Sequence, residues 1–172
     1  MPRLWIPDRT TEIYRFHPVV LILSPLFALV VQTYLPLYIN AVNLLDLPLL
    51  IVIYFGLTRR NPVEGIFSGA LIGMAQDALS RGPIGLLGSA KTVIGYVTSF
   101  VSVRFAVEHR GVRVLTIFIL YYLHSLLLYF FGTLMLGQSL ALSWSNRMIA
   151  ALVNTVVGVL LFELLDRFRK LA

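Results

Sequence analysis

Six apolar segments separated by short loops constrain the fold of this chain more than any other feature of its sequence. A helix needs about 20 apolar residues to cross the hydrocarbon core of a bilayer. Only 13% of the residues are charged and the mean hydropathy is +0.85, which is far from the composition of a soluble domain. The predicted fold is therefore an all-α integral membrane protein with a single transmembrane domain over residues 1–172. The predicted spans are residues 18–38, 44–57, 63–79, 86–107, 112–136 and 148–165.

The positions of the basic residues predict the orientation of these spans. With six spans, Arg81, Lys91 and Arg147 fall on one side, and the remaining 11 of the 14 basic residues fall on the side of the two chain ends. Loops rich in Lys and Arg stay in the cytoplasm, so we expect both termini to be cytoplasmic in a bacterial inner membrane. If the short second segment did not cross, Arg59 and Arg60 would move outside and the bias would largely vanish. The same clustering between apolar runs argues against nucleic acid as the partner of this chain, whose net charge is +6.

Two rows of small residues lie on consecutive predicted helices. On residues 63–79 the row has a spacing of four, which places its members on one helix face. On residues 86–107 a second row follows a spacing of four and three. Helices in lipid pack closely through such faces, so we expect the rows to face each other, although a dimer or partner contact is the alternative. The rows contain Gly65, Gly69 and Gly73, and Gly88, Thr92, Gly95 and Ser99.

A polar group is predicted near the outer end of this helical hairpin. Asp77 continues the glycine row and Lys91 lies beside the second row, so we expect the two to pair across the hairpin. Ionisable side chains within spans are costly and are usually paired or functional. Gln76 and Arg81 complete the group, which is the candidate for a functional pocket or a partner contact. The alternative is a structural ion pair that holds the hairpin together.

Other polar residues within the spans favour structural roles. His124 lies in the middle of the fifth segment with no second His within helical reach, so a hydrogen bond to the protein is expected rather than a metal site. Asn154 is interpreted as an interhelical hydrogen-bond donor. The chain lacks the sequence patterns of a phosphate-binding loop, a zinc protease and a serine hydrolase. We therefore expect no enzyme activity, no cofactor and no metal.

The order of motifs along the chain resembles the MreD family of bacterial rod-shape-determining membrane proteins. The second span starts with Asp46-Leu47-Pro48 and ends at the basic pair Arg59-Arg60. A glycine-rich span then leads to Gln76-Asp77, a short loop, Gly85-Leu86 and a span that reaches Gly95-Tyr96. The resemblance covers almost the whole chain, and its most specific part is the region around residues 76–96.

The resemblance implies a role in the machinery that elongates the peptidoglycan cell wall. Members of the family bind MreC, a single-span protein with a periplasmic β domain, and work with the RodA glycosyltransferase, its transpeptidase and cytoplasmic MreB filaments. Their helices are arranged like those of the substrate-binding membrane subunits of energy-coupling-factor vitamin transporters. The expected function is therefore a non-enzymatic scaffold that regulates peptidoglycan synthesis and rod shape, with membrane lipid around it.

A vitamin-capturing transporter subunit is the alternative function. Such subunits dock through an Ala-x-x-x-Ala row on the first span, and the corresponding stretch here reads LFALVVQTYL, which has no such row. A third possibility, an acyl- or phosphotransferase, lacks a catalytic constellation in the sequence.

Overall fold

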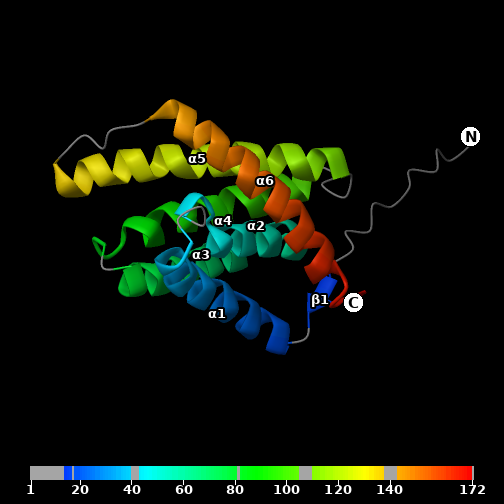
Figure 1. Cartoon of the computed structure of the whole chain (residues 1–172). Helices are drawn as coiled ribbons and strands as arrows, with labels where there is room; N and C mark the ends of the chain where they lie inside the picture. The colour runs from blue at the N-terminus through cyan, green and yellow to red at the C-terminus, as the bar shows by residue number, and fades with distance from the viewer. Residues whose placement is uncertain are drawn as a thin grey trace, which may run out of the picture.

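The computed structural model describes residues 14–16, 18–39, 43–80, 82–104, 110–137 and 143–171, and most of these are helical. The α-helices are α1 (Pro18–Tyr34), α2 (Leu47–Arg59), α3 (Pro62–Ser80), α4 (Leu86–Arg104), α5 (Arg110–Leu136) and α6 (Trp144–Asp166). A short 3-10 helix, η1 (Leu35–Leu37), follows α1. Strands β1 (Tyr14–Phe16) and β2 (Arg169–Leu171) pair antiparallel. This ribbon holds the chain before α1 next to the chain after α6, so both ends of the helical region lie together (Figure 1).

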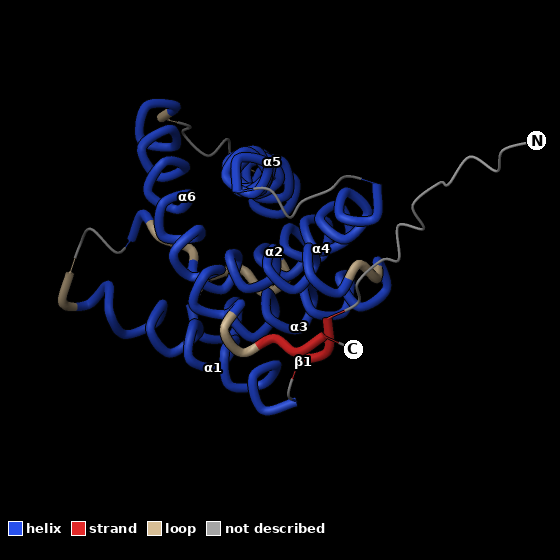
Figure 2. Tube along the Cα trace, turned by 90° about the vertical axis from the view of Figure 1, so that its right-hand side faces the viewer, coloured by secondary structure: helices blue, strands red, loops and turns tan. Residues whose placement is uncertain are grey.

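Helix α2 lies at the centre of the molecule. Its sequence, LPLLIVIYFGLTR, is apolar on every face, and a helix of this kind is expected to be buried all round. Residues 48–58 are all buried, and the other helices surround α2 when the molecule is viewed from its end (Figure 2). Asp46 is the N-cap of the helix, and its carboxylate accepts a hydrogen bond from the Leu49 N–H at 3.0 Å. Arg60 is the C-cap, with a φ of 51°.

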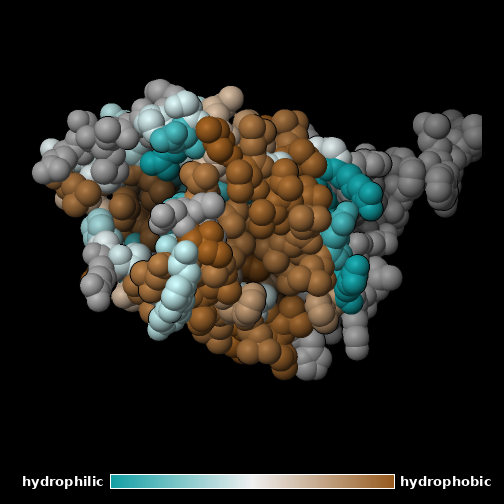
Figure 3. All heavy atoms as spheres, in the orientation of Figure 1, coloured by the Kyte–Doolittle hydropathy of each residue, from teal (hydrophilic) through white to brown (hydrophobic). Residues whose placement is uncertain are grey.

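Four helices of the described chain are long and apolar enough to cross a membrane, so this is a multi-pass membrane protein. The four run over Val19–Leu37, Leu86–Arg104, Arg110–Leu136 and Ser145–Asp166. Helix α2 is apolar but shorter, and α3 is not among the four because its Gly, Ser, Gln and Asp residues lower its hydropathy. One face of the molecule carries a broad belt of hydrophobic side chains, with hydrophilic residues toward the edge where the chain ends lie (Figure 3).

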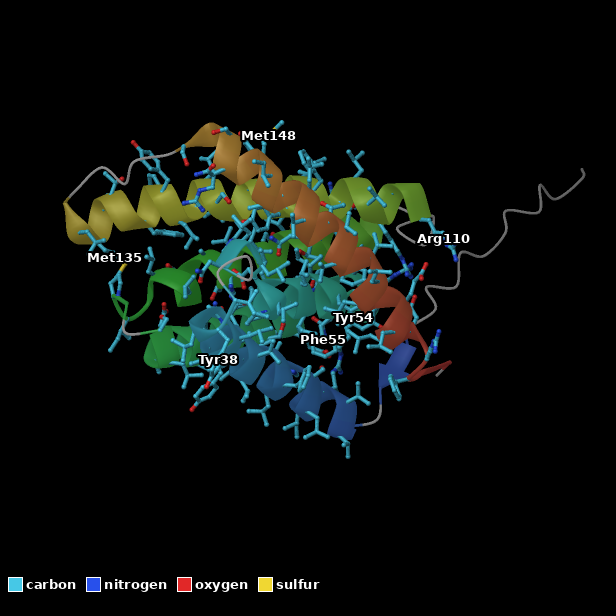
Figure 4. The ribbon with its side chains drawn as sticks, in the orientation of Figure 1. Tyr38, Tyr54, Phe55, Arg110, Met135 and Met148 are labelled. Atoms are coloured by element: carbon cyan, nitrogen blue, oxygen red, sulfur yellow. The ribbon has the colours of Figure 1, made fainter. Side chains whose placement is uncertain are left out.

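A polar clamp joins three helices near that edge. The Tyr54 hydroxyl of α2 donates to the carboxylate of Asp166 on α6 at 3.0 Å, and Arg113 of α5 donates to the same carboxylate at 2.7 Å. The Tyr54 ring also packs edge-on against Phe162, with ring centroids 5.1 Å apart. Tyr54 and Phe55 lie on the central helix in the middle of the molecule, and Arg110 marks the nearby end of α5 (Figure 4). The clamp therefore fixes α2 against the α5–α6 pair at this end.

Candidate functional site

The two rows of small residues face each other along nearly the whole length of α3 and α4. A Cβ atom added at Gly69 would collide with the carbonyl oxygen of Lys91, and one at Gly73 would lie 2.6 Å from the carbonyl oxygen of Leu87. At the other end, a Cβ at Gly65 would collide with the backbone of Gly95 and the hydroxyl of Ser99. Only glycine permits backbones to approach this closely, so the rows are used for packing within the chain. We refer to this contact as the α3–α4 seam.

Asp77 closes the seam at the α3–α4 turn. Its carboxylate accepts hydrogen bonds from three backbone N–H groups, those of Gly85, Leu87 and Gly88, each at 2.9 Å. These amides belong to the start of α4, where the first N–H groups of a helix have no partner within the helix. A carboxylate here also interacts favourably with the positive end of the helix dipole. Asp77 is 2% exposed, so it is a buried cap of α4 rather than a side chain open to an outer pocket.

Lys91 has a different partner from the expected Asp77. Its ammonium group donates to both carboxylate oxygens of Asp46, at 2.8 and 2.7 Å. The Lys91 side chain is fully buried, and that of Asp46 is 15% exposed. The predicted Asp77–Lys91 ion pair is therefore wrong, because backbone amides already hold the Asp77 carboxylate while Asp46 faces Lys91 from the start of α2.

Side chains from three further helices meet at Asp46. Asn154 of α6 accepts from the Asp46 N–H at 2.9 Å and donates to the Leu44 carbonyl at 2.6 Å. Gln32 of α1 donates to the Leu45 carbonyl and accepts from the Leu47 N–H. His124 of α5 places its Nδ1 atom 3.9 Å from the Asp46 carboxylate. These residues, Asp46, Lys91, His124, Asn154 and Gln32, are called the Asp46 cluster.

Two residues of the Asp46 cluster lie in the middle of long helices, whereas Lys91 is in the second turn of α4 and Gln32 is in the last turn of α1. His124 is near the middle of α5 and Asn154 is near the middle of α6. The chain before α2 therefore runs through the interior with its peptide groups bound by side chains of α1 and α6. Irregular backbone is tolerated at membrane depth only where the protein itself satisfies it, and Gln32 and Asn154 supply this.

Of the other two members of the predicted pocket, only Gln76 lies within the described residues. The Gln76 Oε1 atom is buried and accepts no hydrogen bond from a described residue. Arg81 lies outside the described residues. Of the four residues expected to form an outer-facing pocket, Asp77 therefore belongs to a helix cap and Lys91 to an interior ion pair.

Asp46 is the partner of Lys91 that helical spacing in the sequence did not reveal. Its pairing with Lys91 spans 45 positions along the chain, so no helical periodicity links the two. The available signal was the Asp-Leu-Pro start of α2, because Asp before a Pro-containing first turn is typical of a helix N-cap. Since α2 is short and buried all round, a carboxylate that caps it is largely removed from water and needs a cation.

The Asp46 cluster is suited to holding helices in register. A buried ion pair with additional hydrogen bonds fixes geometry, although its net contribution to stability is small because both charges are desolvated. A metal site would need a third acidic residue or His beside Asp46 and His124, and the described residues contain no such group. The His124 Nε2 atom is buried and has no hydrogen-bond partner among the described residues. The geometry therefore places one ion pair and one adjacent imidazole in the middle of the bundle.

No protein-family model matches the chain, and neither the curated proteins nor the solved structures include a significant match.

Proposed function

We propose that this protein is a non-enzymatic membrane scaffold of the bacterial cell-wall elongation machinery, which binds MreC and helps to regulate peptidoglycan synthesis and rod shape. The scaffold role is supported by the contrast between the paired charges of the interior and the apolar side chains of the outer surface. The buried charges of Asp46, Asp77 and Lys91 are bound by the protein itself, whereas large apolar side chains project from the outer helices. The resemblance to the MreD family supplies the cell-wall context. The likeness of the bundle to energy-coupling-factor subunits stays a prediction from the same resemblance.

The proposed topology has six spans. Support comes from the α3–α4 seam, because α3 and α4 each have 19 residues and touch from Gly65 opposite Gly95 to Gly73 opposite Gly88. If α4 crosses the membrane, α3 lies at the same depth. Helix α2 covers about 20 Å at 1.5 Å per residue, and the bound segment before it extends that path through the interior. The β1–β2 ribbon also favours an even number of crossings, because it joins the two ends.

Both termini are proposed to be cytoplasmic on the basis of the basic-residue distribution. The chain has no cysteine, so single cysteines can be introduced one at a time. A membrane-impermeant thiol reagent applied outside the cell should label a cysteine at Ser80 and should not label one at Asn61 or Gly111. The reversed pattern would contradict the orientation, and labelling at all three positions would contradict the six-span topology.

The partner contact is proposed to be helix against helix. Two surfaces are candidates for this contact: the small-residue rows and α5, whose sequence is rich in aromatic residues. The rows already pack against each other, which leaves α5. Five exposed apolar residues recur on one side of α5 at spacings of four and seven, and we propose this stripe as the MreC contact. The stripe contains Leu115, Ile119, Leu126, Phe130 and Leu134.

Two linked experiments test the function and the contact. Depletion in the native rod-shaped host should cause rounded cells that wild-type protein restores. A photoreactive amino acid at Leu126 should then crosslink MreC, while the same group at the exposed Leu160 of α6 serves as the matched control. Normal shape after depletion would contradict the scaffold role, and normal shape with lost vitamin uptake would favour the transporter alternative. Equal crosslinking at both positions would contradict the assignment of the α5 stripe.

A further inference from the structure

A groove of about 620 Å³ lies between α1 and α3, with α2 forming its floor. Pocket volumes of roughly 300–1,000 Å³ are typical of small-molecule sites. Small side chains on α3, including Gly65, Ser68 and Ala75, line the groove opposite Pro25 of α1. Phe55 of α2 lies beneath them. The walls are therefore well formed, and the space between the two helices is not filled by their own side chains.

The groove opens toward the lipid-facing surface rather than toward an aqueous surface. Four of its lining residues also project from the molecule: Ile22, Leu26, Phe67 and Leu71 are 62%, 51%, 63% and 64% exposed. Helix α1 is one of the candidate spans, so these side chains face hydrocarbon when the protein is in a bilayer. An apolar groove in this position is accessible to lipid acyl chains by lateral diffusion.

One end of the groove is polar. Arg59, in the last turn of α2, forms an ion pair with Glu64 in the first turn of α3, and Ser68 lies one turn further along. The Arg59 Nε atom faces Glu64, while its two terminal nitrogen atoms donate no hydrogen bond to a described residue. The Arg59 side chain is 36% exposed. A guanidinium group with spare donors next to an apolar slot is suited to an anionic head group on a hydrocarbon tail.

We propose that this groove binds one acyl chain of an anionic phospholipid, with the lipid phosphate against Arg59. The proposed topology puts Arg59 at the cytoplasmic leaflet, where basic pockets between spans bind anionic head groups. The proposal rests on that topology and not on the role in cell-wall synthesis.

The size of the groove favours an acyl chain over a partner helix. One turn of an α-helix is 5.4 Å tall and 10–12 Å wide, which corresponds to a volume of roughly 400–600 Å³. The groove would therefore take little more than one turn, whereas a spanning helix has five or more turns. A single flexible acyl chain, by contrast, can be accommodated in a volume of this size.

The proposal is tested with the full chain purified in detergent and probed with phosphatidylglycerol or phosphatidylcholine, with bound lipid counted by native mass spectrometry. Ala75→Phe, which fills the groove, should lower retention of both lipids about 10-fold. Arg59→Gln should weaken phosphatidylglycerol about 10-fold and phosphatidylcholine less, because the choline group of phosphatidylcholine partly neutralises the phosphate that Arg59 contacts. Leu160→Phe on α6 and Arg104→Gln at the end of α4 are the matched controls, and both should retain the two lipids as wild type does.

A second measurement covers the case in which Ala75→Phe does not fold. A phosphatidylglycerol with a photoreactive group in its acyl chain should label wild-type protein mainly on α1 and α3 peptides that line the groove. Labelling spread evenly over α5 and α6 would overturn the proposal, as would unchanged lipid retention by folded Ala75→Phe. Crosslinking of MreC in cells from a photoreactive group at Ile22, with no lipid adduct there, would also overturn it in favour of a helix in the groove.

Discussion

The α3–α4 seam and the Asp46 cluster hold the same helix, α4, in two different ways. The seam joins α4 to α3, the helix that precedes it in the sequence. Its glycines have no side chains, so the backbones of Gly69 and Lys91 are in direct contact. The Asp46 cluster joins α4 to α2, α5, α6 and α1 through charged and polar side chains distant in sequence. Packing in the seam depends on shape alone, whereas the cluster depends on exact compensation of buried charge. Substitutions in the two regions should therefore lower the free energy of unfolding by different amounts and for different reasons.

The largest effect is expected when one charge of the Asp46 cluster is removed. Lys91→Met keeps a long apolar side chain but leaves the Asp46 carboxylate without its cation in the interior. Loss of one partner of a buried pair typically costs roughly 3–5 kcal/mol of unfolding free energy. Unfolding in detergent followed by circular dichroism should show this loss. Lys170→Met in the C-terminal segment provides a control for removal of one lysine charge.

A smaller but clear loss is expected in the seam. Gly69→Ala adds a methyl group where the Lys91 carbonyl lies, and overpacking of this kind costs about 1–3 kcal/mol. The same change at Gly111 of α5 meets nothing within 4 Å, so this control should be neutral or slightly stabilising. Equal behaviour of the two variants in thermal unfolding would mean that the seam is looser than its geometry indicates.

A moderate loss is expected at the helix cap. Asp77→Asn keeps one acceptor oxygen and replaces the other with an NH₂ group, which cannot accept hydrogen bonds from the α4 amides. Loss of an N-cap typically costs about 0.5–2 kcal/mol. Hydrogen exchange of the Leu87 and Gly88 amides should accelerate while exchange in α6 stays unchanged. Uniform acceleration throughout the protein would instead indicate global destabilisation.

The smallest effect is expected at the partly exposed Arg59–Glu64 pair between α2 and α3. Surface ion pairs contribute about 0–1 kcal/mol, so Glu64→Gln should change the thermal midpoint only slightly. A loss as large as that of Lys91→Met would show that this pair contributes as much to holding α2 as the Asp46 cluster does.

The sequence predicted local features of the fold well and long-range pairing poorly. Small residues at a spacing of four lie on one face of a helix. The contact between the glycine row of α3 and the row of Gly88 and Gly95 on α4 could therefore be predicted, because the two helices are neighbours in the sequence. The partner of Lys91 could not be obtained in this way, because any carboxylate in the chain satisfies its charge. Asp77 was nearest in sequence, and only the folded structure shows that its oxygens are occupied by amides. The uniformly apolar sequence of α2 indicates a buried, central helix, but it does not indicate which helices pack against it.

A double-mutant cycle measures the Asp46–Lys91 ion pair directly. Asp46→Asn retains an oxygen for the Leu49 cap while removing the charge, and it is combined with Lys91→Met. A parallel cycle combines Asp77→Asn with Lys91→Met. We expect the first double variant to be more stable than Lys91→Met alone, with a coupling of about 0.5–3 kcal/mol, and the second cycle to be additive within about 0.5 kcal/mol. Additivity in the first cycle together with strong coupling in the second would show instead that Lys91 pairs with Asp77.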